Sequence, residues 1–467
     1  MRRFRRITVG VVIALVVFGL TDVRRRAQVD PARPESHRTD LTIFTTAGAA
    51  FLADADPYEV ANPRGWKFAY PPFFALCVAP LAQLPTAWQA VLWYGASLGM
   101  LWLTWREAMR ISRRLDLDTR LSPDNGTRGR MLGWAAGIAV ALPVLNCLQR
   151  GQVGIVNLWL LVWGFRLLLE SNRWRDVFLA GVVLAIPGVI KVTPALPAVT
   201  VVAAWSLRTW RSSNLREAMV APVGLATGAL LFLIVIPGFV LGWQANFRHL
   251  QTWYATIAKM AVDVDPTSTL ETPYTLRNQN LSNAVYRSGN WIDYALLGGP
   301  DDRVIDAVPY DPNHQLRMDS PTVSSVVLVI RLLLLAVLGT VAVVVGTRGD
   351  DRSLAGLFGL ACVLSLVVSP MSRGHYFVLL LPAVLWSPCA LLMREWTRSR
   401  LLMICTPAVL TILHYAALDV AGRAGLLGIG ITIWFLFAAV WEIRRSDREK
   451  VVSSHHVANP TALRRAA

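Results

Sequence analysis

Residues 217–241 read EAMVAPVGLATGALLFLIVIPGFVL and carry no charged side chain after the first position. A helix rises about 1.5 Å per residue, so about 20 apolar residues cross the hydrocarbon core of a bilayer. A continuous apolar segment of this length is typical of membrane proteins. We therefore predict that this segment is a transmembrane helix.

Apolar windows of similar length recur along the whole chain. Hydrophobic residues make up 54% of the 467 residues and charged residues only 16%, which is more apolar surface than a soluble fold can bury. The sequence therefore predicts an all-α integral membrane protein with about 12 transmembrane helices. The windows lie at residues 7–22, 86–105, 131–149, 152–170, 176–190, 192–206, 217–241, 322–346, 353–369, 375–393, 401–418 and 424–442.

The distribution of positive charge gives the predicted orientation of these helices. The net charge of +16 comes mainly from arginines in short clusters between the apolar windows. Because cytoplasmic loops carry such an excess, the pattern argues against nucleic-acid binding. It predicts a multi-pass membrane protein with both termini in the cytoplasm. The clusters lie at residues 106–130, 166–175, 208–216, 348–352, 394–400 and 444–450.

One apolar segment, residues 68–84, is short and contains several prolines. If it crossed the membrane, the arginine-rich loop at residues 106–130 would lie on the outer side, against the positive-inside rule. We therefore expect a re-entrant or surface-lying helix on the outer side.

Two long segments between the windows are predicted to be external, at residues 21–85 and 244–321. Both contain aromatic, proline and polar residues, so we expect them to fold over the membrane domain. We assign residues 1–453 to this membrane domain. Residues 454–467 are predicted to form a polar cytoplasmic tail.

The sequence contains no strong metal-binding pattern. The five cysteines show no Cys-x-x-Cys or Cys/His spacing, which argues against a disulfide framework and a zinc site. Asp54 and Asp56 have a spacing that is able to hold a divalent cation, but such pairs are frequent in loops. We predict neither a metal ion nor a cofactor.

Polar residues that are able to do chemistry gather on the predicted outer side. They are Asp40, Tyr58, Tyr70, Arg150–Gln152, Lys191, Asn278–Arg287 and Ser369–Tyr376. Ionisable groups at membrane depth are costly and usually mark a pathway or a site. Their position on one side favours a single external site.

Asp40 precedes the stretch LTIFTTAGAAFLADADPY, which we expect to begin a helix on the outer surface. A partly desolvated carboxylate is able to accept a proton from a hydroxyl group, which would make Asp40 a general base. An aspartate at this position also fits a helix N-cap, and both interpretations stay open.

Lys191 lies within AIPGVIKVTPALP, between two predicted spans. An unpaired ammonium group would cost several kcal/mol there, so we expect an anionic partner. We interpret Lys191 as a cation that holds a phosphate, with Arg287 and Arg373 as helpers. The alternative is a lysine that extends its side chain to the outer headgroups.

His375 follows a serine-proline break at the start of a predicted span. Beside Ser372 and Arg373 it is placed to contact a phosphate or a sugar hydroxyl, although a lone histidine there is more often a capping residue. Gln152 is the better candidate for the site, and Asn157 for an interhelical hydrogen bond.

Several short motifs follow one another in a defined order. They are DLTIFTTAGAAFLADADPYEVANPRGWKFAYPPFFALCVAPLAQLP, RGQVGIVN, IKVTPAL, NQNLSNAVYR and SPMSRGHY. From Asp40 to Pro382, this order resembles the bacterial polyprenol-phosphate-mannose-dependent mannosyltransferases of glycosyltransferase family 87, also labelled DUF2029.

The resemblance implies a GT-C fold, which is a multi-helix membrane domain with a catalytic aspartate in the first external loop. Asp40 matches that aspartate, and it would deprotonate the acceptor while polyprenyl phosphate leaves with inversion. The predicted donor phosphate-binding residues are Lys191, Arg287, Arg373 and His375. The predicted residues of the substrate groove are Tyr58, Tyr70, Gln152, Asn278 and Asn280.

We therefore expect a membrane glycosyltransferase that uses a polyprenyl-phosphate sugar donor. It would transfer a hexose, mannose by the resemblance, to a glycolipid or envelope glycan on the outer face of the membrane. Transfer of a pentose from the same type of carrier stays open. A transporter or flippase for a lipid-linked sugar would need charged residues along a path from both sides, whereas here they gather on one side.

Overall fold

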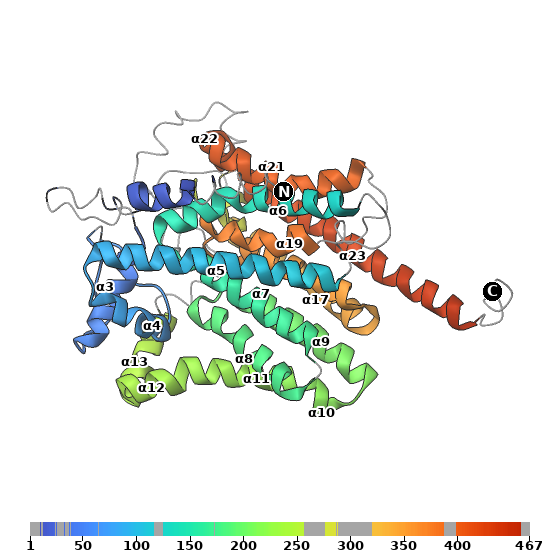
Figure 1. Ribbon diagram of the computed structural model, residues 1–467, viewed down its shortest axis with the longest axis horizontal. Coiled ribbons are helices and arrows are strands. Elements are labelled where there is room, and N and C mark those ends of the chain that lie inside the picture. The colour runs from blue at the N-terminus through green and yellow to red at the C-terminus, as the bar shows by residue number, and fades with distance from the viewer. Residues whose placement is uncertain are drawn as a thin grey trace.

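The computed structural model describes residues 10, 13–23, 25, 32, 37, 39–63, 65–115, 125–171, 173–255, 276–285, 287, 320–386 and 398–458. Within these residues the regular structure is helical, and extended pairing is limited to two isolated bridges, Ala61 with Lys67 and Asn278 with Arg373. The all-α class expected from the sequence is confirmed for this part of the chain (Figure 1).

Long helices make up most of the molecule. They are α5 (Thr86–Arg114), α6 (Asn125–Arg150), α7 (Gly154–Glu170), α8 (Trp174–Ile190), α9 (Ala195–Ser212), α11 (Val220–Leu230), α17 (Ser320–Arg348), α18 (Asp351–Val368), α21 (Arg398–Ala416) and α23 (Leu426–Ala458). The shorter helices are η1 (Gly19–Val23), α3 (Leu41–Leu52), α4 (Pro72–Ala82), α10 (Leu215–Ala218), η3 (Leu231–Val235), α12 (Ile236–Leu241), α13 (Trp243–Trp253), η5 (Gly374–Leu379), α19 (Leu380–Trp386) and α22 (Leu418–Arg423). The predicted domain boundary at residue 453 falls inside α23.

Four helical segments among the described residues are long and apolar enough to cross a membrane. They are Leu215–Leu241, Ser324–Arg348, Asp351–Val368 and Leu426–Arg444, and each coincides with a predicted window. The bent pair of α4 and α5 makes a fifth if it is counted as one span. Other windows are helical but shorter or less continuously apolar, so the expected count of about 12 spans is not confirmed.

The segment of α4 and α5 is the one whose path the sequence left ambiguous. Pro72 begins α4 and Pro85 precedes α5, at helix starts where a missing backbone N–H is tolerated. The two helices are bent by 120° relative to each other. Consequently α4 turns back and packs against α3 instead of extending α5.

Arginine-rich ends of several helices meet at one end of the molecule. Asp351, at the start of α18, accepts from Arg114 of α5 at 3.2 Å and from Arg208 of α9 at 2.9 Å. Figure 1 shows α3 and α13 at the other end of the bundle. The two groups of residues therefore lie at opposite ends of the bundle (Figure 1).

The central helix of the bundle is α18. Within α18, 83% of the apolar window is buried in protein, against 17% for the segment Leu215–Leu241. Phe358 of α18 stacks on Phe165 of α7, with ring centres 4.4 Å apart. The loop that follows α18 therefore leaves a rigid helix, and this loop carries part of the site.

Glycines bring α8 and α11 into close contact. Gly224 and Gly228 lie one turn apart on α11, and Gly181 of α8 faces Gly224. A Cβ atom at Gly228 would lie 2.8 Å from the carbonyl oxygen of Val182. Small residues at this spacing let membrane helices pack backbone against backbone. This contact fixes α8, whose C-terminal end leads into Lys191.

Candidate active site

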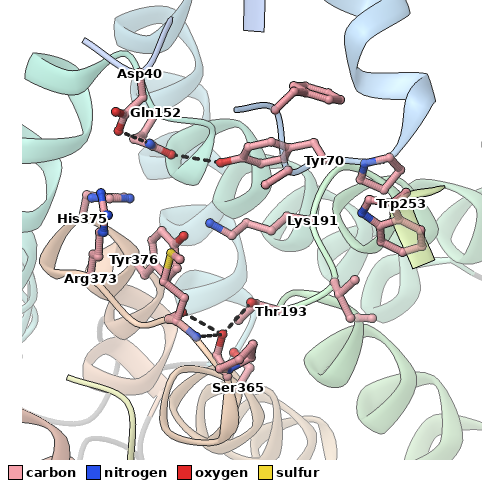
Figure 2. A pocket seen from close by; sticks show the side chains of 18 of the residues that line it. Asp40, Tyr70, Gln152, Lys191, Thr193, Trp253, Ser365, Arg373, His375 and Tyr376 are labelled. Carbon is pink, nitrogen blue, oxygen red and sulfur yellow. Dashed lines mark hydrogen bonds between the residues drawn. The ribbon is translucent and has the colours of Figure 1, made fainter. Parts of the chain in front are cut away.

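A cavity of about 920 Å³ lies beside the start of α3. Its walls come from the loop before α4, the α6–α7 turn, the α8–α9 turn and the segment from α18 into η5 (Figure 2). The predicted site residues that line it are Asp40, Tyr70, Gln152, Lys191, Arg373 and His375. The fold thus brings together residues from five separate segments of the sequence.

Asp40 is held by the turn between α6 and α7. Its backbone N–H donates to the carbonyl oxygen of Arg150 at 2.8 Å. Its Oδ2 accepts from Arg150 Nε at 3.0 Å and also from the side-chain amide of Gln152. Asp40 occupies the N-cap position of α3, but its side chain makes no capping hydrogen bond. The N-cap interpretation therefore does not describe this carboxylate.

Gly151 allows the turn to lie this close to α3. Its φ is +67°, a conformation that other residues rarely adopt. A Cβ atom here would lie 2.8 Å from Cβ of Leu41. Glycine therefore lets the turn approach until Arg150 and Gln152 bond to Asp40.

Gln152 connects Asp40 to Tyr70. The Tyr70 hydroxyl donates to Gln152 Oε1 at 3.3 Å, while the Gln152 amide nitrogen donates to Asp40 (Figure 2). Burial raises the pKa of the Tyr70 phenol, so its hydroxyl stays protonated and remains a donor. These bonds order one wall of the cavity.

Lys191 follows the last residue of α8 and extends into the cavity (Figure 2). Its Nζ lies 3.3 Å from the ring centre of Tyr376 and 5.5 Å from that of Tyr70. Burial, and then the charge of Arg373, lower the pKa of Lys191 to about 7. Its side chain therefore lies among cavity residues, and a bound anion would favour the charged ammonium.

The indole of Trp66 lies beside two guanidinium groups. Arg150 Cζ is 5.6 Å from the ring centre and Arg373 Cζ is 5.9 Å from it. Both distances fit a cation–π interaction. Burial, and then the charge of Arg150, lower the pKa of Arg373. Trp66 thus anchors two cations close to Asp40.

His375 completes the wall next to Arg373. Its imidazole is buried and meets the Tyr376 ring edge-on, with centres 4.5 Å apart. Among the described residues, neither ring nitrogen has a hydrogen-bond partner. His375 therefore makes no capping hydrogen bond there, and the residue lines the cavity.

The cavity carries an excess of positive charge. Asp40 is the only carboxylate among the described residues that line it, and it is paired with Arg150. Lys67, Lys191 and Arg373 line the same space. A positive cavity with aromatic walls fits a ligand that combines a phosphate with a sugar ring.

No metal cluster accompanies these charges in the described part of the chain, where no group of three or more His, Cys, Asp or Glu is placed to hold an ion. The pair singled out in the sequence is engaged elsewhere. Asp56 Oδ1 accepts from the backbone N–H of Tyr58 at 2.8 Å and lies 3.7 Å from His249 Nδ1. Asp56 therefore links the loop after α3 to α13.

Tyr58, which we predicted to line the substrate groove, is not part of the cavity wall. Its hydroxyl donates to the backbone carbonyl of Tyr70 at 2.9 Å, and its ring packs against Phe68. In this structure Tyr58 therefore supports the Tyr70 loop.

Asn278, Asn280 and Arg287, which we predicted to contact the substrate or the donor phosphate, also lie outside the cavity wall. Asn278 Oδ1 accepts from the backbone N–H of Ser372 at 2.9 Å, and the Asn280 amide donates to the carbonyl oxygen of Pro370. Arg287 donates to the Asn278 carbonyl at 2.7 Å. These side chains point toward backbone groups and hold the loop that carries Arg373 and His375.

Sequence reasoning did not assign site roles to Arg150, Trp66 and Tyr376. Each lies next to a predicted residue in sequence or in space, and aromatic rings near a candidate cation are a usable signal. The sequence does not show which ring faces which cation, because the partners come from different helices.

Comparison with known families identifies the class of protein. The chain matches the model of glycosyltransferase family 87 over residues 68–370, which is more than half of its length. Together with its apolar helices, this match makes the protein a membrane glycosyltransferase. The chain belongs to glycosyltransferase family 87, as the resemblance predicted.

Two characterised relatives are similar to the chain. The polyprenol-phosphate-mannose-dependent alpha-(1-2)-phosphatidylinositol mannoside mannosyltransferase of Mycolicibacterium smegmatis is 23% identical over 365 residues, which cover 74% of this chain and 69% of that protein. The polyprenol-phosphate-mannose-dependent alpha-(1-2)-phosphatidylinositol pentamannoside mannosyltransferase of Mycobacterium tuberculosis is 30% identical over 135 residues, or 29% of this chain and 28% of that protein.

Proposed function

We propose that this glycosyltransferase transfers mannose from polyprenyl phosphate mannose to a glycolipid on the outer face of a bacterial inner membrane. The observation that carries the proposal is a single cavity that combines a carboxylate, a lysine and an apolar side wall. The two mannosyltransferase relatives support the donor and a phosphatidylinositol-based acceptor. The arginine-rich end at α5 and α9 supports cytoplasmic termini and an external site.

The donor phosphate binds at Lys191, with Arg373 and His375 in the same cavity. A sugar phosphodiester carries one negative charge, which offsets part of the positive excess. The cavity also includes Val192, Val199 and Leu335, whose exposed fractions are 43%, 53% and 38%. In a membrane these exposed apolar side chains face lipid, so the polyprenyl chain leaves the cavity on this side.

Asp40 acts as the general base. The acceptor hydroxyl transfers its proton to the carboxylate, and its oxygen forms a bond to the anomeric carbon. The bond from that carbon to the phosphate oxygen breaks, and its electron pair leaves with polyprenyl phosphate. Attack from the face opposite the leaving phosphate inverts the anomeric centre. Lys191 stabilises the charge that gathers on the phosphate.

Transfer of label from two radiolabelled donors tests this function in membranes that contain the chain. We expect a mannosylated lipid from polyprenyl phosphate mannose and no product from polyprenyl phosphate arabinose, with membranes lacking the chain as the control. A product from the arabinose donor alone would show that the enzyme transfers a pentose and not a hexose. Movement of the intact donor across sealed vesicles without transfer would support a flippase instead.

Donor affinity should depend on pH through Lys191. The donor phosphodiester keeps its charge, whereas burial and the charge of Arg373 lower the pKa of Lys191 to about 7. The affinity for the donor is therefore highest below that pH, where the ammonium is charged. Above it the affinity falls, by up to about tenfold per pH unit. Equilibrium binding of polyprenyl phosphate mannose from about pH 6 to about pH 9 measures this. The Lys191→Arg variant should show a flat profile, because arginine stays charged.

A further inference from the structure

The two oxygens of the Asp40 carboxylate have different environments. Oδ2 accepts hydrogen bonds from both Arg150 and Gln152. Oδ1 is buried and has no hydrogen-bond partner among the described residues. A buried carboxylate oxygen without a partner is costly, so this atom is suited to receive a donor from a bound ligand.

Arg150 lies behind Asp40 and does not form part of the cavity wall. The wall includes Asp40, Trp66 and Gln152, which contact Arg150 or share its partner. Its carbonyl oxygen accepts from the Asp40 N–H at 2.8 Å and from the Thr39 hydroxyl at 3.0 Å. Arg150 therefore holds both the backbone and the side chain of Asp40 from outside the cavity wall.

We propose that Arg150 is a positioning residue for sugar transfer. With Gln152 it holds Oδ2 of Asp40, so that Oδ1 is the oxygen that accepts the proton of the acceptor hydroxyl. This inference rests on the proposed role of Asp40 as the base, and it adds the reacting atom and the residue that orients it.

The hydrogen-bonding pattern is compatible with proton transfer to Oδ1 alone. When the acceptor O–H bond breaks, its electron pair forms the bond to the anomeric carbon and its proton binds Oδ1. Oδ2 is then the carbonyl oxygen of a carboxylic acid and still accepts from Arg150 and Gln152. A proton on Oδ2 would displace one of these donors, at the cost of a charge-assisted hydrogen bond.

The two arginines beside Trp66 should separate experimentally into two roles. Arg373 lines the cavity, whereas Arg150 acts through Asp40. We expect Arg150→Gln to lower kcat by about 100-fold with the donor KM within about twofold, because the base loses its orientation. We expect Arg373→Gln to raise the donor KM. The Arg150→Lys variant keeps the charge and should stay within about tenfold of the wild-type kcat.

The same substitution in an Asp40→Asn background tests whether Arg150 acts through Asp40. If it does, Arg150→Gln should change the residual rate of Asp40→Asn by less than about twofold. If the rate losses of the two single variants multiply in the double variant, the proposal is overturned. It is also overturned if Arg150→Gln weakens donor binding as much as Arg373→Gln does. Equilibrium binding of polyprenyl phosphate mannose shows that each variant is folded. If Arg150→Gln does not fold, the same measurements are made with Arg150→Lys.

Failure of this inference is distinguishable from failure of the proposed function. A wild-type chain that transfers no mannose contradicts the function itself. Equal rates for wild type and Asp40→Asn reject Asp40 as the base, and with it the role of Arg150. Full activity of Arg150→Gln, with Asp40→Asn inactive, rejects the role of Arg150 alone.

Discussion

Asp40→Asn should lower the rate of mannose transfer by about 100-fold to 10,000-fold, because general base catalysis contributes a factor of this size. Asparagine has nearly the same shape, and its amide oxygen is able to accept from Arg150 and Gln152 as Oδ2 does. Its amide nitrogen would then occupy the position of Oδ1, where it cannot accept a proton. Initial rates at saturating radiolabelled donor measure the effect.

Asp54→Asn is the matched control for this experiment. Asp54 is exposed just after α3, lies outside the cavity wall and has a φ of +55°, which asparagine tolerates. We expect a wild-type rate for this variant. A loss of activity confined to Asp40→Asn, with donor affinity within about twofold, supports the base. Equal transfer by Asp40→Asn and wild type would exclude Asp40 from the chemistry.

Lys191→Met should weaken donor binding by about 10-fold to 100-fold, because a hydrogen bond to a charged group contributes about 1.5–3 kcal/mol. Methionine retains much of the apolar stem that lies against Tyr70 and Tyr376 but removes the ammonium. Lys191→Arg keeps the charge and should bind the donor within about tenfold of wild type. The dissociation constant of polyprenyl phosphate mannose is the quantity to measure.

Lys67→Met provides the comparison for Lys191. Lys67 also lines the cavity, but it is exposed, so solvent screens its charge and we expect less than about a threefold change in affinity. Equal donor affinity for Lys191→Met and wild type would contradict phosphate binding at this position. Similar losses for both lysines would indicate a diffuse electrostatic effect.

Three of the predicted site residues that line the cavity share one property. Asp40 and Lys191 adjoin helix ends, and Gln152 lies in a glycine-containing turn between two helices. Once the direction of each helix is predicted, a residue at a helix end can be assigned to one end of the bundle. The charge pattern predicted the helix directions. These three residues were therefore expected on one side of the membrane, without knowledge of how the helices pack.

The predicted site residues that lie outside the cavity wall include two in a segment whose side-chain directions depend on tertiary contacts. Asn278 and Asn280 are as polar as Gln152, but they bond to the backbone of residues 370–372. Burial of that backbone requires hydrogen-bond partners, and these side chains supply them. No feature of NQNLSN separates such a role from contact with a sugar.

The span count shows a related difference. Helices α7 and α8 are each 17 residues long, and α4 turns away from α5 by 120°. Hydrophobicity measures how apolar a segment is, but burial against α18 and exposure to lipid both require apolar residues. The path of each shorter helix relative to the membrane is therefore a property of its neighbours as well as of its own sequence.

Composition, apolar windows and the order of short motifs determined that this chain is an all-α membrane protein and a family 87 glycosyltransferase, because apolar length and family motifs are local features of a sequence. The tertiary structure alone decided that Arg150 and Gln152 share one oxygen of Asp40, and that Lys191 lies between Tyr70 and Tyr376. These contacts join residues that are up to 185 positions apart, from Lys191 to Tyr376. Their geometry depends on how the helices pack against one another, and the pattern of residues along the chain does not predict that packing.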